Sequence, residues 1–218
     1  KRVEKNINNF QKNINKTRDI NYSNKAVNSI HDIDKHDKYF KKFSKKNKIR
    51  RVAKFLLESE PEFRKCEVFA KPAKKGLKSP IHQDNYYWGI KNNNGLTIWI
   101  ALDKSSKKNG GLTYYEGSHK YGIVDHIDSN APGSSQKIKS SILKKKLKKN
   151  KIITPNLEVG DALIHHCLTF HGSNKNLSNK SRKGFTIQFK DKNSRYDKKL
   201  TSHYEKRLKA QLKKRGQN

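Results

Sequence analysis

The chain consists of a polar amino-terminal part followed by a part with regularly spaced apolar residues. Residues 1–48 are rich in Lys and Asn and have few apolar positions at any regular interval, so we expect them to form a peripheral or partly disordered segment. After this segment, apolar residues recur with helical spacing as Ile49, Val52, Ala53, Leu56 and Leu57. The spacing predicts a helix with one apolar face that ends before Pro61.

Short apolar segments separated by turn signals follow this helix. We expect strands at residues 66–73, 96–103, 111–117, 161–170 and 184–190. The sequence Asn109-Gly110-Gly111, which lies between two of these segments, is typical of a hairpin turn. Many short strands with turns between them predict a mainly β fold, a barrel or jelly roll, with flanking helices.

Two lysine-rich segments accompany the strands. Residues 137–151 have apolar positions at helix-like spacing, which predicts a helical insert. A solvated helix outside the barrel is favoured there over a lid formed with residues 125–136. Residues 197–214 predict a carboxy-terminal helix, because Leu200, Tyr204, Leu208 and Leu212 recur every four residues. No repeat or linker is visible, so we expect residues 49–218 to form a single domain.

The chain is strongly basic. Its 51 Lys and Arg against 19 Asp and Glu give a formal net charge of +32, and only 32% of the residues are hydrophobic. Such a charge favours a polyanionic partner, because lysines that neutralise phosphates release bound counterions. However, the charge is nearly all lysine, is spread along the chain and lacks the interleaved arginines and aromatics of a nucleic-acid surface. We therefore interpret it as a compositional bias and expect no specific nucleic-acid partner.

The two cysteines, Cys66 and Cys167, lack the spacing of a metal site and are too few for a disulfide framework. Cys167 lies in an apolar run, which predicts a buried free thiol and a reducing compartment. No segment has the length of a membrane span, and the first thirty residues lack the apolar core of a signal peptide. These features predict a soluble, cytoplasmic protein. The sequence begins at Lys1 and contains no Met, so we expect a longer protein whose missing amino end could hold a signal.

His82-Gln83-Asp84 and the distant His171 carry the strongest indication of chemistry. Side chains two apart in an extended strand point the same way, so His82 and Asp84 can reach one metal ion while Gln83 turns away. Two imidazoles and one carboxylate are the ligand set that holds a ferrous ion and leaves its opposite face open. Taken alone the pattern is weak, because nine histidines can produce it by chance and because zinc accepts the same ligands.

Four sequence blocks surround these residues. They read HQDNYYWGIKNNNGLTIWIALD, NGGLTYYEGSHK, VGDALIHHCLTFHGSNKN and SRKGFTIQF, at residues 82–103, 109–120, 159–176 and 181–189. Together they resemble the phytanoyl-CoA dioxygenase (PhyH) family of Fe(II)- and 2-oxoglutarate-dependent oxygenases. The resemblance implies a double-stranded β-helix, a cupin-like jelly-roll barrel. It also implies Fe(II), the cosubstrate 2-oxoglutarate and O2, and a hydroxylase that releases succinate and CO2.

By this resemblance the metal ligands are His82, Asp84 and His171. Spacing alone leaves His165 or His166 open in place of His171, and the HGSNKN context decides for His171. Asp84 implies hydroxylation, because related halogenases resemble this pattern but carry a small residue in its position. We expect no catalytic residue beyond the metal ligands.

Arg182 is implied as the partner of the distal carboxylate of 2-oxoglutarate. A guanidinium suits this role because it forms two parallel charge-assisted hydrogen bonds with a carboxylate, although Arg182 could be one more surface cation. Trp99 and Ser173 fall where the family places further cosubstrate contacts. Trp99 could equally be a core residue, and Ser173 could make a local turn hydrogen bond.

Candidate substrate contacts follow from strand parity. Tyr86 shares parity with His82 and Asp84, so we expect it to face the cavity. We also expect His166 to face the cavity and its neighbour His165 to point the other way, with packing as the default role of both. The expected substrate is a small molecule, and the basic surface would favour an anionic one through electrostatic steering.

Alternatives from other classes stay open. A non-catalytic barrel could bind a ligand or a polyanion through its basic surface. An oxygenase acting on nucleic-acid bases is disfavoured, because that family usually has a second arginine where this chain has Gln188. Prolyl-hydroxylase relatives usually have a lysine near the position of Arg182. The identity of the substrate and the oligomeric state do not follow from the sequence.

Overall fold

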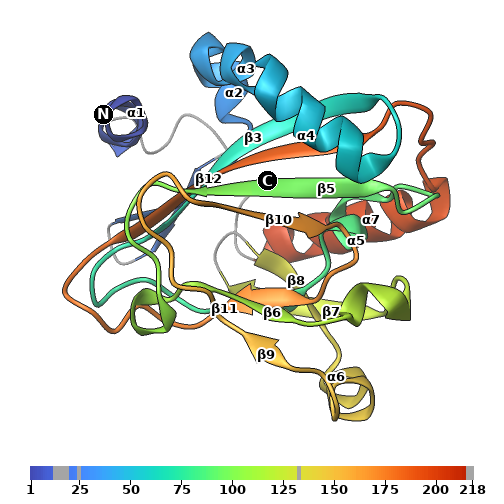
Figure 1. Ribbon diagram of the computed structural model, residues 1–218. Coiled ribbons are helices and arrows are strands. Elements are labelled where there is room, and N and C mark those ends of the chain that lie inside the picture. Colours follow the sequence, from blue (N-terminus) through green and yellow to red (C-terminus); the bar gives the residue numbers. More distant parts are fainter. Residues whose placement is uncertain (12–19, 24–25, 132–133, 215–218) are drawn as a thin grey trace.

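Two antiparallel sheets face each other in the computed structural model, which describes residues 1–11, 20–23, 26–131 and 134–214 (Figure 1). The larger sheet has the strand order β1-β2-β3-β12-β5-β10 and the smaller sheet the order β4-β11-β6-β9. Their bounds are β1 Ile20–Ser23, β2 Ala26–Ile30, β3 Pro61–Lys71, β12 Arg182–Asp191, β5 Gly95–Ala101 and β10 Ala162–His166, then β4 Ser79–His82, β11 His171–Ser173, β6 Leu112–Tyr115 and β9 Ile152–Ile153.

From β3 to β6 and from β9 to β12, successive strands alternate between the two sheets. β3 and β5 belong to the larger sheet and β4 and β6 to the smaller one, and the same alternation repeats from β9 to β12. This winding is the predicted double-stranded β-helix. The predicted hairpin at 109–111 is wrong, because β5 and β6 lie in different sheets and a short 3-10 helix, Lys107–Asn109, stands between them.

The central strands of the larger sheet have one apolar and one polar face. The outward side chains of β12 are Phe185, Ile187 and Phe189, each at most 3% exposed. Their inward neighbours Thr186 and Gln188 lie beside Glu67 of β3 and Thr97 of β5. Because strand side chains alternate in direction, the apolar residues form the core while the polar ones line the space between the sheets.

Three helices cover the apolar outer face of the larger sheet (Figure 1). They are α2 (Ile33–His36), α3 (Lys38–Ser44) and α4 (Asn47–Leu57). Phe40 of α3 packs its ring 5.1 Å from that of Phe185. The predicted helix from residue 49 is present as α4, and it stops at Leu57 because Glu58 adopts a left-handed conformation with φ 52°.

Part of the polar amino-terminal segment belongs to the main core. Ile30 and Ile33 are fully buried and Phe40 is 3% exposed, in one cluster with the strands of the larger sheet. The expectation of a peripheral segment is therefore wrong for residues 26–44, because their few apolar side chains are concentrated on the sheet. The same segment includes α1 (Arg2–Gln11), and its residues 12–19 and 24–25 lie outside the described ranges.

The lysine-rich insert forms a short helix, α6 (Ser140–Lys146), after the hairpin of β7 (His126–Ala131) and β8 (Ser134–Ile138). α6 lies beyond the smaller sheet, on the side away from the larger one (Figure 1). Its Ile142 and Leu143 pack against the cluster that contains Phe170. The position agrees with a helix on the outside of the barrel rather than with a lid.

The carboxy-terminal helix α7 spans Lys198–Lys214, close to the predicted bounds, and contacts α5 (Asp84–Trp88). Arg207 connects α7 to the hairpin, since its guanidinium binds Asp128 and the carbonyl oxygen of His126. A second 3-10 helix spans Ser118–Tyr121. Within the described ranges, no helix combines the length and the apolar character needed to cross a membrane.

Both cysteines are free and buried. Cys66 lies in the core cluster of the larger sheet, and Cys167 lies in a second cluster beside Trp88. Burial raises the pKa of both thiols, so neither has the thiolate character of a reactive cysteine. The predicted buried free thiol at Cys167 is confirmed.

Replacing Ile33 tests whether the amino-terminal segment is part of the folded core. Ile33→Ala should lower the free energy of unfolding by about 2–5 kcal/mol, because it removes buried methyl groups and leaves a cavity. Ile152→Ala is the matched control, since Ile152 is 61% exposed and such a surface change usually stays within about 0.5 kcal/mol. Urea unfolding measures both, and equal effects of the two substitutions would show that Ile33 is not packed in the core.

Candidate metal centre

His82 and Asp84 lie at the junction of a strand and a helix. β4 ends at His82, and α5 begins at Asp84. Gln83 between them has an extended backbone, with φ −118° and ψ 135°. Extended backbone sends neighbouring side chains to opposite sides, so His82 and Asp84 converge as predicted even though Asp84 is already helical.

Gln83 anchors this junction from the other side. Its side chain is fully buried, and its amide nitrogen donates hydrogen bonds of 2.8 Å to the carbonyl oxygens of Gly122 and Leu168. Its amide oxygen accepts a hydrogen bond of 2.9 Å from the backbone N–H of Val124. As predicted, Gln83 points away from His82 and Asp84. The three hydrogen bonds hold the segment in place.

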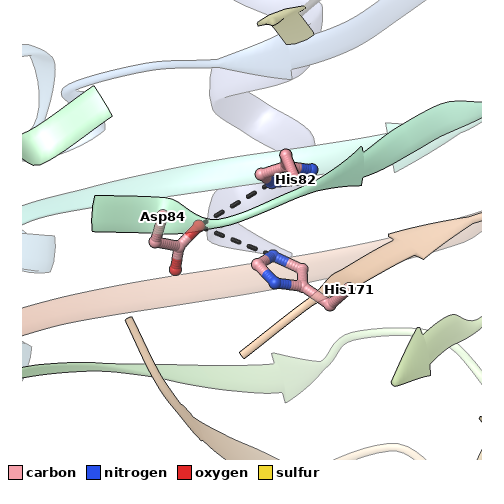
Figure 2. Close-up of side chains that lie close together, drawn as sticks. All are labelled: His82, Asp84 and His171. Carbon is pink, nitrogen blue, oxygen red and sulfur yellow. Dashed lines mark ion pairs between the residues drawn. The ribbon is translucent and has the colours of Figure 1, made fainter. Parts of the chain in front are cut away.

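His171 reaches the same point from the neighbouring strand. It is the first residue of β11, directly opposite His82 of β4 in the strand register. The Nε2 atoms of His82 and His171 lie 3.7 and 3.5 Å from Oδ1 of Asp84 (Figure 2). One ligand atom from each residue falls within 4.8 Å of the others, so the three side chains could hold one metal ion.

Both imidazoles are oriented by backbone carbonyl groups. Nδ1 of His82 lies 2.8 Å from the carbonyl oxygen of Pro80, and Nδ1 of His171 lies 2.9 Å from that of Thr169. A carbonyl oxygen can only accept, so each Nδ1 carries the proton and each Nε2 keeps its lone pair toward Asp84. Burial lowers the pKa of His82, and it lowers the pKa of His171 to about 3. Both rings are therefore neutral, the form that binds a metal.

Asp84 is held by two residues of the larger sheet. The Thr97 hydroxyl donates a hydrogen bond of 2.6 Å to Oδ2, and Nε2 of His165 lies 3.2 Å from the same oxygen. Burial alone would raise the pKa of Asp84, but His171 and the hydrogen bond from His165 outweigh it and hold that pKa well below its usual range. Asp84 is thus a carboxylate whose Oδ1 faces the two imidazoles.

Arg182 lies at another point of the same inner space. It is the first residue of β12 and only 2% exposed. Its guanidinium donates to the carbonyl oxygen of Gly110, over 3.1 Å from Nε and 2.7 Å from Nη2. In the ranges that the structure covers, no carboxylate lies within 4 Å of it. Burial lowers the pKa of Arg182 to about 10, so the group remains a cation at neutral pH.

The structure brings Trp99 to Arg182, with the guanidinium carbon 5.4 Å from the centre of the Trp99 ring. Ser173 is 5% exposed, and its strand position is opposite Leu112 of β6 and Ser79 of β4. The two histidines of the cluster thus come from the smaller sheet, whereas Trp99 and Arg182 come from the larger one.

The sequence of the chain matches a known family. A sequence model described as phytanoyl-CoA dioxygenase (PhyH) matches residues 2–184, which is most of the chain. The chain belongs to the phytanoyl-CoA dioxygenase family. The peroxisomal phytanoyl-CoA dioxygenase of Bos taurus is 30% identical over 124 residues, which are 56% of this chain and 36% of the bovine protein.

A second relative has another substrate in its name. The "Probable alpha-ketoglutarate-dependent hypophosphite dioxygenase" of Stutzerimonas stutzeri is 32% identical over 108 residues, covering 50% of this chain and 38% of that protein. The chain thus spans little more than a third of the length of either relative.

Solved structures share the fold at low sequence identity. EctD from S. alaskensis, solved with 2-oxoglutarate and 5-hydroxyectoine, superposes with a TM-score of 0.73 at 19% identity. The match covers 89% of this chain and 68% of that one. The form of EctD with bound Fe gives a TM-score of 0.72 at 20% identity, covering 90% of this chain and 69% of that chain. The double-stranded β-helix is thereby confirmed.

His165 and His166 lie the opposite way from the parity expected in this PhyH chain. His165 pairs with Thr97 across β10 and β5 and faces Asp84. Its Nδ1 also lies 3.0 Å from the hydroxyl of Tyr114. His166 instead turns to His119, with ring centres 5.9 Å apart. The prediction was wrong because it lacked the register of β10, and that register is the signal that identifies His165.

Tyr86 does not face the candidate metal centre. The parity argument assumed a continuing strand, but Tyr86 lies in the helix α5, where side chains two apart diverge. Its ring stacks on His126 at 4.0 Å, and its hydroxyl accepts a hydrogen bond from Arg207. The neighbouring Tyr87 lies beside the site instead, with its ring centre 5.7 Å from that of His82.

Thr97→Val tests how Asp84 is positioned. The change keeps the shape of the side chain and removes the hydrogen bond to Oδ2, so we expect metal affinity to fall by about 10–100-fold, as for other residues that orient metal ligands. Calorimetric titration with Mn(II) measures the affinity. Thr113→Val is the matched control, because the Thr113 hydroxyl contacts Thr154 rather than the cluster. An unchanged affinity in the Thr97 variant would show that Asp84 does not depend on this hydroxyl.

Proposed function

We propose that this PhyH chain is an Fe(II)- and 2-oxoglutarate-dependent dioxygenase that hydroxylates a small molecule and releases succinate and CO2. The observation that carries the proposal is the presence of two sites in the one space between the two sheets. One is the cluster of His82, Asp84 and His171, and the other is Arg182, a buried cation with no carboxylate within 4 Å in the described part of the chain. Two imidazoles and a carboxylate fit ferrous iron with positions left open.

Iron bound by these three residues would supply the activation of O2 at the expense of 2-oxoglutarate. One oxygen atom enters the substrate as hydroxyl and the other enters succinate as CO2 leaves. The chain itself positions the reactants. His82 and His171 present neutral Nε2 atoms, and Thr97 and His165 keep Oδ1 of Asp84 directed to the same point. Asp84 supports hydroxylation, since it supplies the carboxylate that the related halogenases lack.

Arg182 would bind the distal carboxylate of 2-oxoglutarate. Its burial removes competing water, so a charge-assisted hydrogen bond there is stronger than at the surface. The Trp99 ring beside the guanidinium would form a wall of the same pocket. Ser173, buried on β11, is the third residue that we assign to the cosubstrate.

A polar wall flanks the metal cluster on the other side. Gln188, opposite Thr97 in the strand register, donates a hydrogen bond of 2.5 Å to Oε2 of Glu67. Lys65 and His31 contact the same carboxylate, and although burial opposes its ionisation they hold the pKa of Glu67 at about 2. The Oε1 atom of Gln188 is buried and has no hydrogen-bond partner in the part of the chain that is described.

This wall favours a small polar substrate with a hydrogen-bond donor for Gln188. A buried acceptor without a partner costs about 1–3 kcal/mol, which a substrate donor would offset. The charged side chains would disfavour a long alkyl group at this position. One relative carries the small molecule hypophosphite in its name. The structurally similar EctD was solved with the small molecule 5-hydroxyectoine. The net charge of +32 would add steering of an anionic substrate.

We propose the cytoplasm, because both thiols are free and buried, as in a reducing environment. The bovine relative is named as peroxisomal. A barrel that binds a ligand or polyanion without turnover is the alternative function, favoured by the charge of +32.

Anaerobic titration with Fe(II) and then 2-oxoglutarate tests the proposal through the weak visible charge-transfer band of the chelate. We expect the band in the unmodified protein and its loss in Asp84→Ala. In Arg182→Ala the half-saturating 2-oxoglutarate concentration should rise roughly 10–100-fold, because hydrogen bonds to charged groups contribute about 1.5–3 kcal/mol. Arg51→Ala, at an exposed position of α4, should leave it unchanged. A well-folded protein without the band would support the non-catalytic barrel.

A substrate panel read out by succinate release tests the polar wall. Small polar acids and amides should stimulate succinate release above the rate without substrate, and Gln188→Leu should raise their KM more than it lowers kcat. The reason is that the variant removes a contact made before and during the reaction. Stimulation by long acyl-CoA thioesters alone would contradict the assignment of this wall to a polar substrate.

A further inference from the structure

Lys71 and Arg182 are buried cations placed side by side. Lys71 ends β3 and is directly opposite Arg182 of β12 in the antiparallel register. Residues in such a pair project from the same face of the sheet. Lys71 is 5% exposed and Arg182 is 2% exposed. Two positive charges therefore lie together where water is largely excluded.

In the described ranges, the hydrogen-bond acceptors of these two cations are backbone carbonyl oxygens. The Lys71 ammonium donates to the carbonyl oxygen of Leu77, and Arg182 donates to that of Gly110. Both side chains converge on Gly110, because a Cβ added there would lie 2.7 Å from Cδ of Lys71. Across the described ranges, no carboxylate lies within 4 Å of either cation. The ammonium has three N–H bonds, and the Leu77 carbonyl uses one.

Two other lysines on these strands, one buried and one partly buried, have carboxylate partners. Lys190 of β12, 3% exposed, lies 3.1 Å from Glu62. Lys65 of β3 lies 2.9 Å from Glu67. Buried charge is costly unless it is paired, so the placement of Lys71 beside a second cation calls for an anion that is not part of the chain.

The location of the two cations indicates which anion binds between them. In the pairing of β12 with β3, Lys71 and Arg182 form the end that is farthest from Gln188. Gln188 is opposite Thr97, which contacts Asp84 and so lies level with the metal cluster. We infer that Lys71 acts with Arg182 in binding the distal carboxylate of 2-oxoglutarate, so that two cations share one carboxylate. The inference rests on the proposed use of 2-oxoglutarate and adds a residue to that site. A dicarboxylate is then selected over a 2-oxo acid with a single carboxylate.

The position of Lys71 beside Arg182 makes the binding of 2-oxoglutarate depend on pH. Burial and the charge of Arg182 lower the pKa of Lys71 to about 7. Asp103, which follows β5, and Tyr114 of β6 act in the opposite direction on Arg182 and raise its pKa. The loop after β11 contacts Lys71 through Asn176, which donates to the backbone oxygen only. Lys71 carries its charge below pH 7 in the free protein, and a bound carboxylate raises its pKa, so affinity decreases as the pH rises above 7.

Calorimetric titration of Mn(II)-loaded protein tests the inference without turnover. The ligands are 2-oxoglutarate and 2-oxobutyrate, which lacks the distal carboxylate. Lys71→Met, which keeps most of the stem, should weaken 2-oxoglutarate binding about tenfold at pH 6.5 and leave 2-oxobutyrate unchanged. Lys190→Met is the matched control, because it removes an equally buried lysine that has a carboxylate partner. Lys190→Met should change neither the affinity for 2-oxoglutarate nor the affinity for 2-oxobutyrate.

The pH profile gives a second measurement that needs no variant. Between pH 6 and 8.5 the unmodified protein should lose 2-oxoglutarate affinity above pH 7, and the profile should be flat in Lys71→Met. Failure of the unmodified protein to bind 2-oxoglutarate would overturn the proposed function itself. Binding that is equal in both proteins, or that weakens equally for both ligands, would overturn the role of Lys71 and leave it as a packing residue under Leu77. A flat profile in the unmodified protein would also overturn it.

Discussion

The register of β12 between β3 and β5 is the constraint on which the rest of this PhyH chain depends. It sends Phe185, Ile187 and Phe189 into the core under the helices, where each such side chain contributes about 1.5–3 kcal/mol by burial. It also sends Arg182 and Gln188 into the space between the sheets. A slip of one residue would exchange the two sets. Folding of the core and orientation of the inner polar groups are therefore one event.

Polar groups between the sheets are tolerated because almost all of them are hydrogen-bonded. Gln83 satisfies three backbone groups, and the carboxylate of Asp84 receives Thr97 and His165 on one oxygen. A partly satisfied network would be less stable than an apolar interior. Because Thr97 and His165 already hold Asp84 by hydrogen bonds, the geometry of this carboxylate is fixed before a metal binds.

Local spacing in the sequence was enough for part of this arrangement. His82 and Asp84 are two residues apart, so their convergence needs only extended backbone at Gln83, and the apolar faces of α4 and α7 follow from helical periodicity. Tyr86 and the pair His165 and His166 could not be placed correctly. Their directions depend on where β4 gives way to a helix and on how β10 pairs with β5, and neither is encoded within a few residues. The buried role of residues 26–44 likewise depends on distant strands.

The two histidines of the candidate metal centre and Arg182 lie on opposite sheets, and this has a consequence for the stability of the protein in a cell. His82 and His171 belong to the smaller sheet and Arg182 to the larger one. Under the proposed function, a metal with its cosubstrate would act as a removable crosslink between the two halves of the barrel. By mass action such a crosslink stabilises the folded form by a free energy that grows with the logarithm of the free concentrations of both components. A shortage of iron would then expose the chain to proteolysis. The abundance of the protein would follow the supply of iron and 2-oxoglutarate even at a constant rate of synthesis.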